Sequence, residues 1–158
     1  MLTPQAAFTR SLMAILRADS TLAAGGVFNT GVQAEAAGAY LLVQERTERQ
    51  ERAFGARVCK VLTFALTALW RDAAGANYAN GEALLQRCQY LCDGGSSQAD
   101  FARIQAAFNA QLDPLGYFLM SLVQTGATPL LDEAIGPDET QRRYSRGYLY
   151  TAFVRGQC

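Results

Sequence analysis

Residues 40–70 read YLLVQERTERQERAFGARVCKVLTFALTALW, and this stretch decides the fold. Both of its ends are apolar and rich in the β-branched and aromatic residues that favour strands. In the second half, large apolar side chains share one parity and smaller side chains the other. These are Leu62, Phe64, Leu66 and Trp70 against Thr63, Ala65 and Thr67. With a turn at Gly55 between the halves, the pattern predicts a long antiparallel β-hairpin.

Within this hairpin, the stretch ERTERQER at 45–52 carries six charged side chains. They comprise equal numbers of both signs and sum to zero: Glu45, Arg46, Glu48, Arg49, Glu51 and Arg52. A patch that binds nucleic-acid phosphates would not carry as many carboxylates as guanidinium groups. Because both strand faces are polar here, we expect this half of the hairpin to extend beyond the chain's own core. Two interpretations stay open, a solvated loop and a surface that pairs with a copy of itself.

The flanking segments predict helices. The first helix begins at Thr3 and Pro4, and ADSTLAAGG at residues 18–26 ends it before a short strand, VFN. A second helix lies within 71–95, and a third within 96–116, capped by Ser97 and ended by Pro114. The second helix has a buried stripe formed by Leu84, Leu85, Cys88, Leu91 and Cys92.

The last third of the chain predicts two strands joined by a long connection. YFLMSLVQT at 117–125 reads as a strand, and 127–142 as a connecting arm or loop with Pro129 and Pro137. The final strand, YSRGYLYTAFVRG, is apolar on both parities, so we expect both of its faces to be covered by a helix, a second sheet or another subunit. The sum is a single α+β domain over residues 1–158: a mainly antiparallel sheet with a long β-hairpin and helices packed on one face.

Composition excludes several classes of function. The 158 residues hold 14 basic and 14 acidic side chains and are 50% hydrophobic, so no net charge steers the chain to nucleic acid or membrane. There is no histidine, which removes Ser-His-Asp and Cys-His catalysis and any His-based zinc site. We expect no cofactor and no metal, and we expect Cys59, Cys88 and Cys92 to be buried thiols. No signal peptide or membrane span is apparent, so the expected compartment is a reducing cytoplasm.

One local basic and aromatic cluster stands out near the end of the chain. RRYSRG brings Arg142, Arg143 and Arg146 beside Tyr144. Such a cluster can contact a phosphate backbone. It can equally form the charged entrance of a strand or face acidic residues of a partner, and the zero net charge favours these readings.

The order of these segments resembles one family. The opening helix, ADSTLAAGGVFNTG, AYLLVQERTERQE, ARVCKVLTFALTALWRDAAGANYANGEALLQRCQYL and the final RRYSRGYLYTAFV together resemble the tail-terminator (tail-completion) proteins of long-tailed bacteriophages and gene transfer agents. The resemblance covers most of the chain, is topological, and includes no catalytic residue. Residues 93–116 look like an extra helix compared with a typical member.

This resemblance implies a structural role. Members form rings, usually hexamers, that cap the tail tube and meet the neck or connector proteins, with DNA passing only through the lumen. It implies a place in the virion tail, with assembly in the host cytoplasm and no membrane contact. As a hypothesis, the hairpin tip and the 127–142 arm protrude to contact a neighbouring subunit or the tail tube. The interface residues are then Glu45, Arg46, Glu48, Arg49, Glu51, Arg52, Arg142, Arg143 and Arg146.

Two alternatives remain beside a tail terminator. A head-tail connector or other neck protein is also a small ring-forming virion component. A small cytoplasmic ligand-binding domain would instead place Trp70, Tyr148 and Tyr150 around an apolar pocket. An enzyme is the least supported class, because no base, nucleophile or metal constellation can be assembled from these residues.

Overall fold

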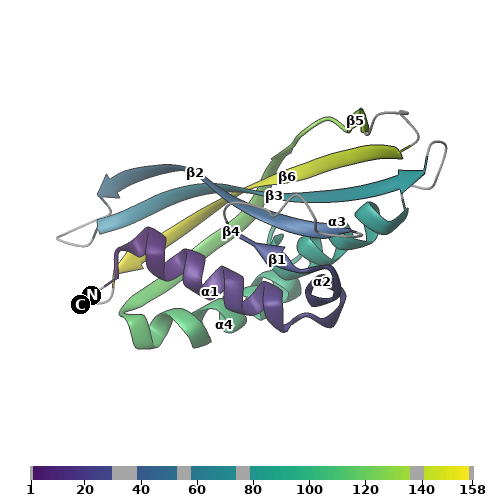
Figure 1. Cartoon of the computed structure of the whole chain (residues 1–158). Coiled ribbons are helices and arrows are strands. Elements are labelled where there is room, and N and C mark those ends of the chain that lie inside the picture. Colours follow the sequence, from purple (N-terminus) through teal and green to yellow (C-terminus); the bar gives the residue numbers. More distant parts are fainter. Residues whose placement is uncertain (1, 30–38, 53–57, 74–78, 136–140, 157–158) are drawn as a thin grey trace.

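The structure, a computed structural model, describes residues 2–29, 39–52, 58–73, 79–135 and 141–156 (Figure 1). The described helices are α1 Pro4–Ala18, α2 Ser20–Gly25, α3 Ala79–Cys92 and α4 Gln98–Leu112, followed by a short 3₁₀ helix, Asp113–Leu115. The described strands are β1 Val27–Phe28, β2 Tyr40–Arg52, β3 Val58–Ala73, β4 Tyr117–Ala127, β5 Leu131–Ile135 and β6 Gln141–Gly156.

The strands form one sheet in the order β1-β2-β3-β6-β4, with β5 beside the first part of β6. Only β1 pairs in parallel, with β2, and every other described pairing is antiparallel. The predicted hairpin is confirmed, since β2 and β3 pair from Tyr40–Leu69 to Arg52–Val58. β6 then pairs with the other side of β3 along the whole of Cys59–Ala73. The charged half of β2 is therefore the edge strand of a continuous sheet.

The hairpin tip at 53–57 lies outside the described residues, so its protrusion stays a prediction. The β3 side of the charged half does pack on the chain's own core, because Leu62 and Phe64 are both 3% exposed. The expectation that this half lies beyond the core therefore fails for β3. Pairing with β6 from the far end of the chain brings these apolar residues over the helices.

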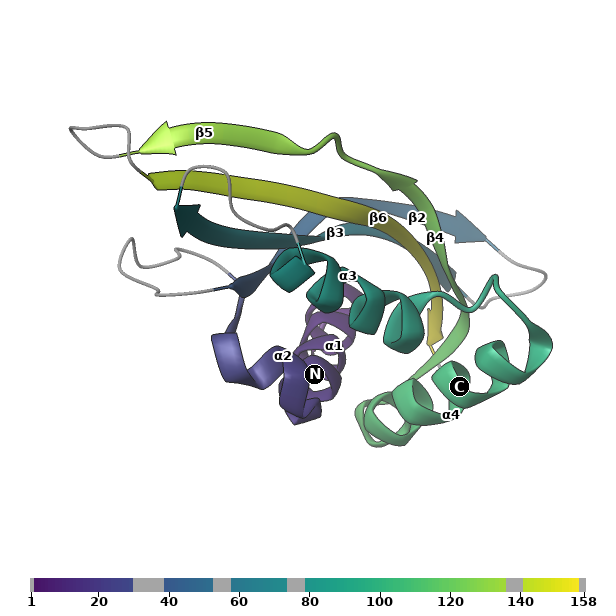
Figure 2. The same cartoon turned by 90° about the vertical axis from the view of Figure 1, so that its right-hand side faces the viewer.

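All the helices lie on one side of the sheet (Figure 2). The predicted α+β class, with a mainly antiparallel sheet and helices on one face, is confirmed. A row of aromatic rings joins the two layers: Phe8 of α1 contacts Phe64 at 5.3 Å and Phe108 of α4 at 5.5 Å between ring centroids. Phe64 in turn stacks on Tyr150 of β6 at 5.4 Å. Offset or tilted contacts at these distances suit the ring quadrupoles.

The predicted helix caps are present. The Thr3 hydroxyl accepts from the backbone N–H of Ala6 at 3.2 Å, and the Ser97 hydroxyl accepts from that of Asp100 at 3.1 Å. α4 is part of the single core, because Ile104, Phe108 and Leu112 are all buried; that relatives lack this helix stays a prediction.

Two elements differ from the sequence prediction. The segment 18–26 is not simply a break, because Asp19 ends α1 and its carboxylate caps a second helix, α2, by accepting from the N–H groups of Thr21 and Leu22. Six residues are too few to show a helical period in sequence. The glycines at 25–26, expected to end the first helix, end α2 instead, and the φ of 91° at Gly26 is accessible to glycine without strain.

The second difference lies in the expected arm. Residues 131–135 form β5 and pair with residues 141–145 of β6, so the prediction of a loop is wrong for them. The reason is length: β6 has 16 residues and β4 only 11. β4 pairs with β6 from Tyr148 onward, and β5 occupies the edge of β6 that β4 leaves open. Residues 136–140 of the arm lie outside the described part.

Candidate assembly surface

The sheet face opposite the helices is not covered by any described element (Figure 2). We call it the outer face. By strand register, its central residues are Val61, Thr63, Ala65, Leu149, Thr151 and Phe153, with Phe118 and Val123 from β4. Val61 and Ala65 are buried yet do not belong to the core that the helices share, while Leu149 and Phe153 are half-buried. Half of the prediction for the last strand therefore holds: helices cover one side of β6, and its other apolar side faces outward.

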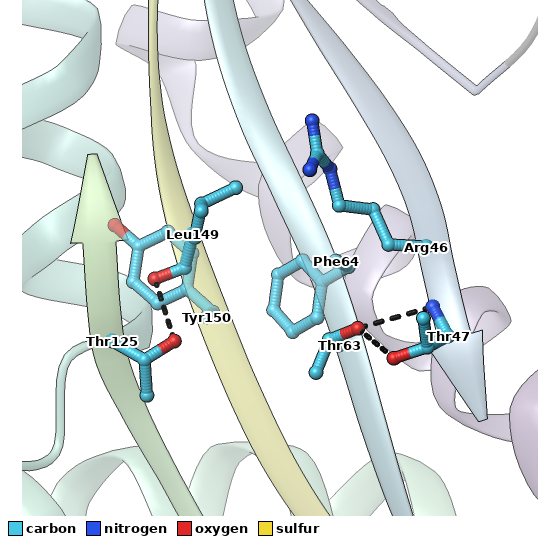
Figure 3. Close-up of a pocket in the computed structure, with 7 residues that line it drawn as sticks. All are labelled: Arg46, Thr47, Thr63, Phe64, Thr125, Leu149 and Tyr150. Carbon is cyan, nitrogen blue, oxygen red and sulfur yellow. Dashed lines mark hydrogen bonds between the residues drawn. The ribbon is translucent and has the colours of Figure 1, made fainter. Parts of the chain in front are cut away.

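A row of threonines crosses the outer face. Thr47 of β2 and Thr63 of β3 join through their hydroxyls, and the Thr47 N–H also donates to the Thr63 hydroxyl at 3.0 Å. On the other side of the sheet centre, the hydroxyls of Thr125 and Thr151 lie 3.1 Å apart. These short side chains leave a hollow of about 480 Å³, lined also by Arg46, Leu149 and parts of Phe64 and Tyr150 (Figure 3).

Arg46 stands at the rim of this hollow. The register of β2 against β3 shifts between Glu45 and Thr47, so Arg46 occupies a β-bulge. Its side chain extends from β2 toward β3 (Figure 3). It is exposed and makes no ion pair within the described part of the chain.

The other charges of ERTERQER divide between the two faces. Glu45 turns to the helical layer, where its carboxylate accepts from Thr9 at 2.5 Å and from Gln5 at 3.0 Å. Glu48 pairs with Lys60 at 3.2 Å on the same side. Arg49 lies opposite Val61 and so belongs to the outer face. Glu51 and Arg52 are strand residues of β2 whose side chains lie outside the description.

The predicted cluster RRYSRG is likewise split by strand alternation. Tyr144 is 2% exposed and stacks on Trp70 at 5.5 Å, on the helical side. Arg146 is on the same side and pairs with Glu82 of α3 at 2.8 Å. Arg143 points to the outer face, and Arg142 is described only as a strand residue. The three arginines therefore do not form one phosphate-binding patch.

The two edges of the sheet are treated differently. Along β4, side chains of α4 and the loop after α3 bind the backbone groups that face away from β6. The Asn109 side-chain oxygen accepts from the Leu119 N–H at 2.7 Å, and the Gln105 side chain donates to the Leu119 carbonyl at 3.0 Å. The Gly94 N–H donates to the Leu122 carbonyl at 2.9 Å. Such contacts block strand addition at this edge. Along β2, protection comes from the bulge and from the inward-facing Glu45 and Glu48.

The core holds no evident catalytic arrangement within the described residues. No group of three or more His, Cys, Asp or Glu side chains there could hold a metal. Cys59, Cys88 and Cys92 are buried free thiols, as predicted; Cys158 lies outside the description. Burial, with a smaller effect of Asp19, raises the pKa of the Cys88 thiol to about 12, so it stays protonated.

The aromatic residues of the ligand-binding alternative do not surround one pocket. Trp70 is 1% exposed and Tyr150 is fully buried in the core, and only Tyr150 contributes to the hollow on the outer face. No described helix has the length and apolar character needed to cross a bilayer.

Tyr90 on α3 is a second surface feature, and no sequence pattern indicated it. It lies off the buried stripe of that helix and is 47% exposed. Its ring is flanked by the guanidinium groups of Arg87 and Arg103, 4.6 Å and 3.7 Å from the ring centroid. The three-residue helical spacing between Arg87 and Tyr90 could have indicated the first of these contacts from the sequence. Arg103 belongs to α4 and reaches Tyr90 only through tertiary packing.

Comparisons with known proteins find a similar fold but no similar family or curated sequence. No protein-family model matches the chain, and no curated protein sequence matches it. A chain in the solved structure described as "Virion of native gene transfer agent (GTA) particle" is similar over 99% of this chain and 100% of that chain, with a TM-score of 0.57 and 20% identity. A second solved chain has a TM-score of 0.41 and 17% identity, covering 94% of this chain and 92% of its own length.

The first similarity runs from end to end of both chains. The chain therefore shares its whole α+β fold with a component of a gene transfer agent particle. At 20% identity, fold alone is shared, and any role must be argued from the surfaces.

Proposed function

We propose that this chain is a structural protein of a phage-like particle, namely a tail terminator. Copies of it form a ring that caps the tail tube and joins it to the head or neck. The observation that carries the proposal is the end-to-end similarity of fold to a chain of a gene transfer agent virion. The shared length matters, because neither chain carries an additional domain-sized region that the other lacks.

The outer face supports an assembly role on physical grounds. Sheets of soluble monomers normally place polar residues on a face that no helix covers. Here Leu149, Phe153, Phe118 and Val123 are half-buried apolar residues on such a face. A partner that covers them removes further apolar surface from water, which is the main favourable term in association.

The proposed partners follow from the same role. Further copies of the chain complete the ring, most simply a hexamer. The tail tube protein and the neck or connector proteins contact its two ends, and DNA only passes through the lumen. The protein thus resides in the virion tail, is assembled in the host cytoplasm, and performs no catalysis.

The decisive experiment is deletion of the gene followed by electron microscopy of the particles. A tail terminator predicts overlong or headless tails, because nothing stops tube growth. Heads that leak DNA beside unattached tails of normal length would instead identify a head-tail connector. Normal infectious particles would refute both roles.

A charge-reversal variant tests the predicted interface. Changing Arg46, Arg49 and Arg52 together to Glu should prevent tail completion while the far-UV circular dichroism stays unchanged. Arg10→Glu, an exposed arginine on α1, serves as the control and should leave particles normal. Normal particles from the triple variant would exclude the β2 edge from the interface.

A further inference from the structure

β2 has an open edge along its charged half. β1 pairs with Leu41 and Leu42, and no other described strand lies beside β2 on this edge (Figure 1). After the bulge, β2 is again a regular strand, because residues 47–52 pair one for one with β3. At such an edge, backbone N–H and C=O groups point away from the sheet and can pair with a further strand. We call residues 48–52 the β2 edge segment.

The charges of the β2 edge segment divide evenly between the two sides of the sheet. Arg49 lies opposite Val61 on the outer face, and strand alternation places residue 51, a Glu, on that face too. Glu48 pairs with Lys60 on the helix-facing side, and the same alternation places residues 50 and 52, a Gln and an Arg, on that side. Each side of the segment therefore has one charge of each sign.

A second copy of the segment matches this pattern in one register. Two identical edges that join into one sheet run antiparallel about a two-fold axis perpendicular to the sheet, and both copies keep their helices on the same side. Opposed residues then lie on the same face, so the axis passes beside one residue, which faces its own copy. An axis at residue 48 or 51 opposes Glu to Glu, and an axis at 49 or 52 opposes Arg to Arg. Within the segment, only an axis at Gln50 avoids a like-charge pair.

With the axis at Gln50, every charged residue of the segment is placed opposite the other sign. Arg49 of each copy is opposite Glu51 of the other on the outer face, and Glu48 is opposite Arg52 on the helix-facing side. Directly opposed residues have Cβ atoms about 4.5–5.5 Å apart, and opposite charges at that spacing stabilise a strand pair. The Glu48 carboxylate has two oxygens, so it can accept from Arg52 of the other copy as well as from Lys60.

We propose that the β2 edge segment of one copy pairs antiparallel with that of a second copy, about a two-fold axis at Gln50. A copy of this chain is the partner rather than an unrelated strand, because an unrelated strand would leave the alternating charges without opposite charges beside them. The two helical layers do not compete for space. α1 meets β2 at Glu45, roughly 15 Å along the strand from the axis, and the axis carries each layer to its own end of the joined sheet.

This pairing concerns the free protein and goes beyond the proposed ring. A two-fold contact uses up its own surface and stops at two copies, whereas a ring with two different ends is built from heterologous contacts. In the free protein, the pairing covers a strand edge that could otherwise recruit other chains. Ring closure through the same edge requires the dimer to open first.

Exchanging the outer-face charges tests the register in the full-length protein. Arg49→Glu leaves two acidic residues on the outer face of the segment, and Glu51→Arg leaves two basic ones. Each variant alone should dimerise at least about tenfold more weakly than the wild type in sedimentation equilibrium, because both outer-face pairs become repulsive. An equimolar mixture of the two variants should regain the wild-type association, because each copy then meets the opposite charge. The double variant should dimerise alone.

The mixture separates a contact between copies from an effect within one chain. Neither variant in it regains its own pair of opposite charges, so recovery can arise only between copies. Far-UV circular dichroism verifies that each variant is folded, and Arg10→Glu, on exposed α1 surface, is the charge control that should dimerise like the wild type. No recovery in the mixture overturns the proposal. Wild-type protein that stays monomeric at high concentration also overturns it and leaves the edge to a strand of another protein.

A disulfide trap locates the axis. In a Cys158→Ser background, Gln50→Cys places a thiol opposite its own copy, at a Cα separation of about 4.5–5.5 Å that a disulfide can span. Oxidation should give a covalent dimer and no larger species, since the described native cysteines are buried. Gln44→Cys, at an exposed β2 position before the bulge, is the matched control and should stay largely monomeric. Equal crosslinking of the two variants would refute the register.

These results separate the contact from the function. A protein that forms rings but never a Gln50→Cys crosslink refutes this contact and leaves the tail-terminator role standing. A two-fold dimer from a protein whose gene deletion leaves tails normal supports the contact and refutes the role.

Discussion

Replacing Phe108 with Ala should remove much of the free energy of unfolding of this chain, because Phe108 joins α4 to the rest of the core. It is fully buried and stacks on Phe8 with ring planes 12° apart. Truncating a buried Phe to Ala costs about 3–5 kcal/mol in unfolding free energy. For a chain of this size, that loss lowers the melting temperature by roughly 6–20 °C. Urea titration followed by far-UV circular dichroism measures it, with the slope expected to stay constant.

Phe153→Ala is the matched control, because it removes the same side chain from the outer face. Phe153 is only half-buried there, so we expect a cost of about 1–2 kcal/mol. In the proposed ring, its larger effect should be on self-association. A loss below about 1 kcal/mol for Phe108→Ala would show that α4 is an appendage outside the cooperative core. Equal losses for the two variants would refute the distinction between a packed and an uncovered sheet face.

Three further predictions follow from single contacts. Asp19→Ala should lower the unfolding free energy by about 1–2 kcal/mol by removing the α2 cap and the partner of Arg87. Because the pKa of Asp19 is lowered in the folded protein, the loss of unfolding free energy caused by Asp19→Ala should be complete above pH 3.8 and should shrink as the pH falls through the folded-state pKa. Chemical denaturation of both proteins at several pH values measures this loss, and a loss that does not change with pH would refute the ion pair. Cys88 and Cys92 should react with a thiol reagent at pH 8 only on unfolding, because burial raises both pKa values, and fast labelling of the native protein would contradict this. Asn109→Ala should expose the β4 edge and increase aggregation on light scattering without loss of α4, and unchanged scattering would argue against edge protection.

The sequence predicted those helices and strands whose caps, apolar stripes or alternation lie within the element itself. The cap at Thr3, the stripe on α3 and the alternation in β3 each depend on residues within one or two turns or one strand. The two elements missed were short. α2 has six residues and β5 has five, and the latter forms because a longer strand from another part of the chain leaves an edge open.

The candidate surface depended on tertiary structure much more strongly. In the sequence, Arg143, Tyr144 and Arg146 look like one cluster, but strand alternation sends neighbours to opposite faces. Arg103 lies beside the exposed Tyr90 ring only because α4 packs against α3.

By itself, the sequence determined the class of the fold, the hairpin at its centre and the absence of histidine chemistry, because propensity, periodicity and composition are local properties. Only the tertiary structure decided which side of each strand the helices cover, and therefore which charges and apolar residues remain outside. That decision comes from packing between segments distant in sequence, where β6 joins β3 and β4 and fixes one face of all of them toward the same core.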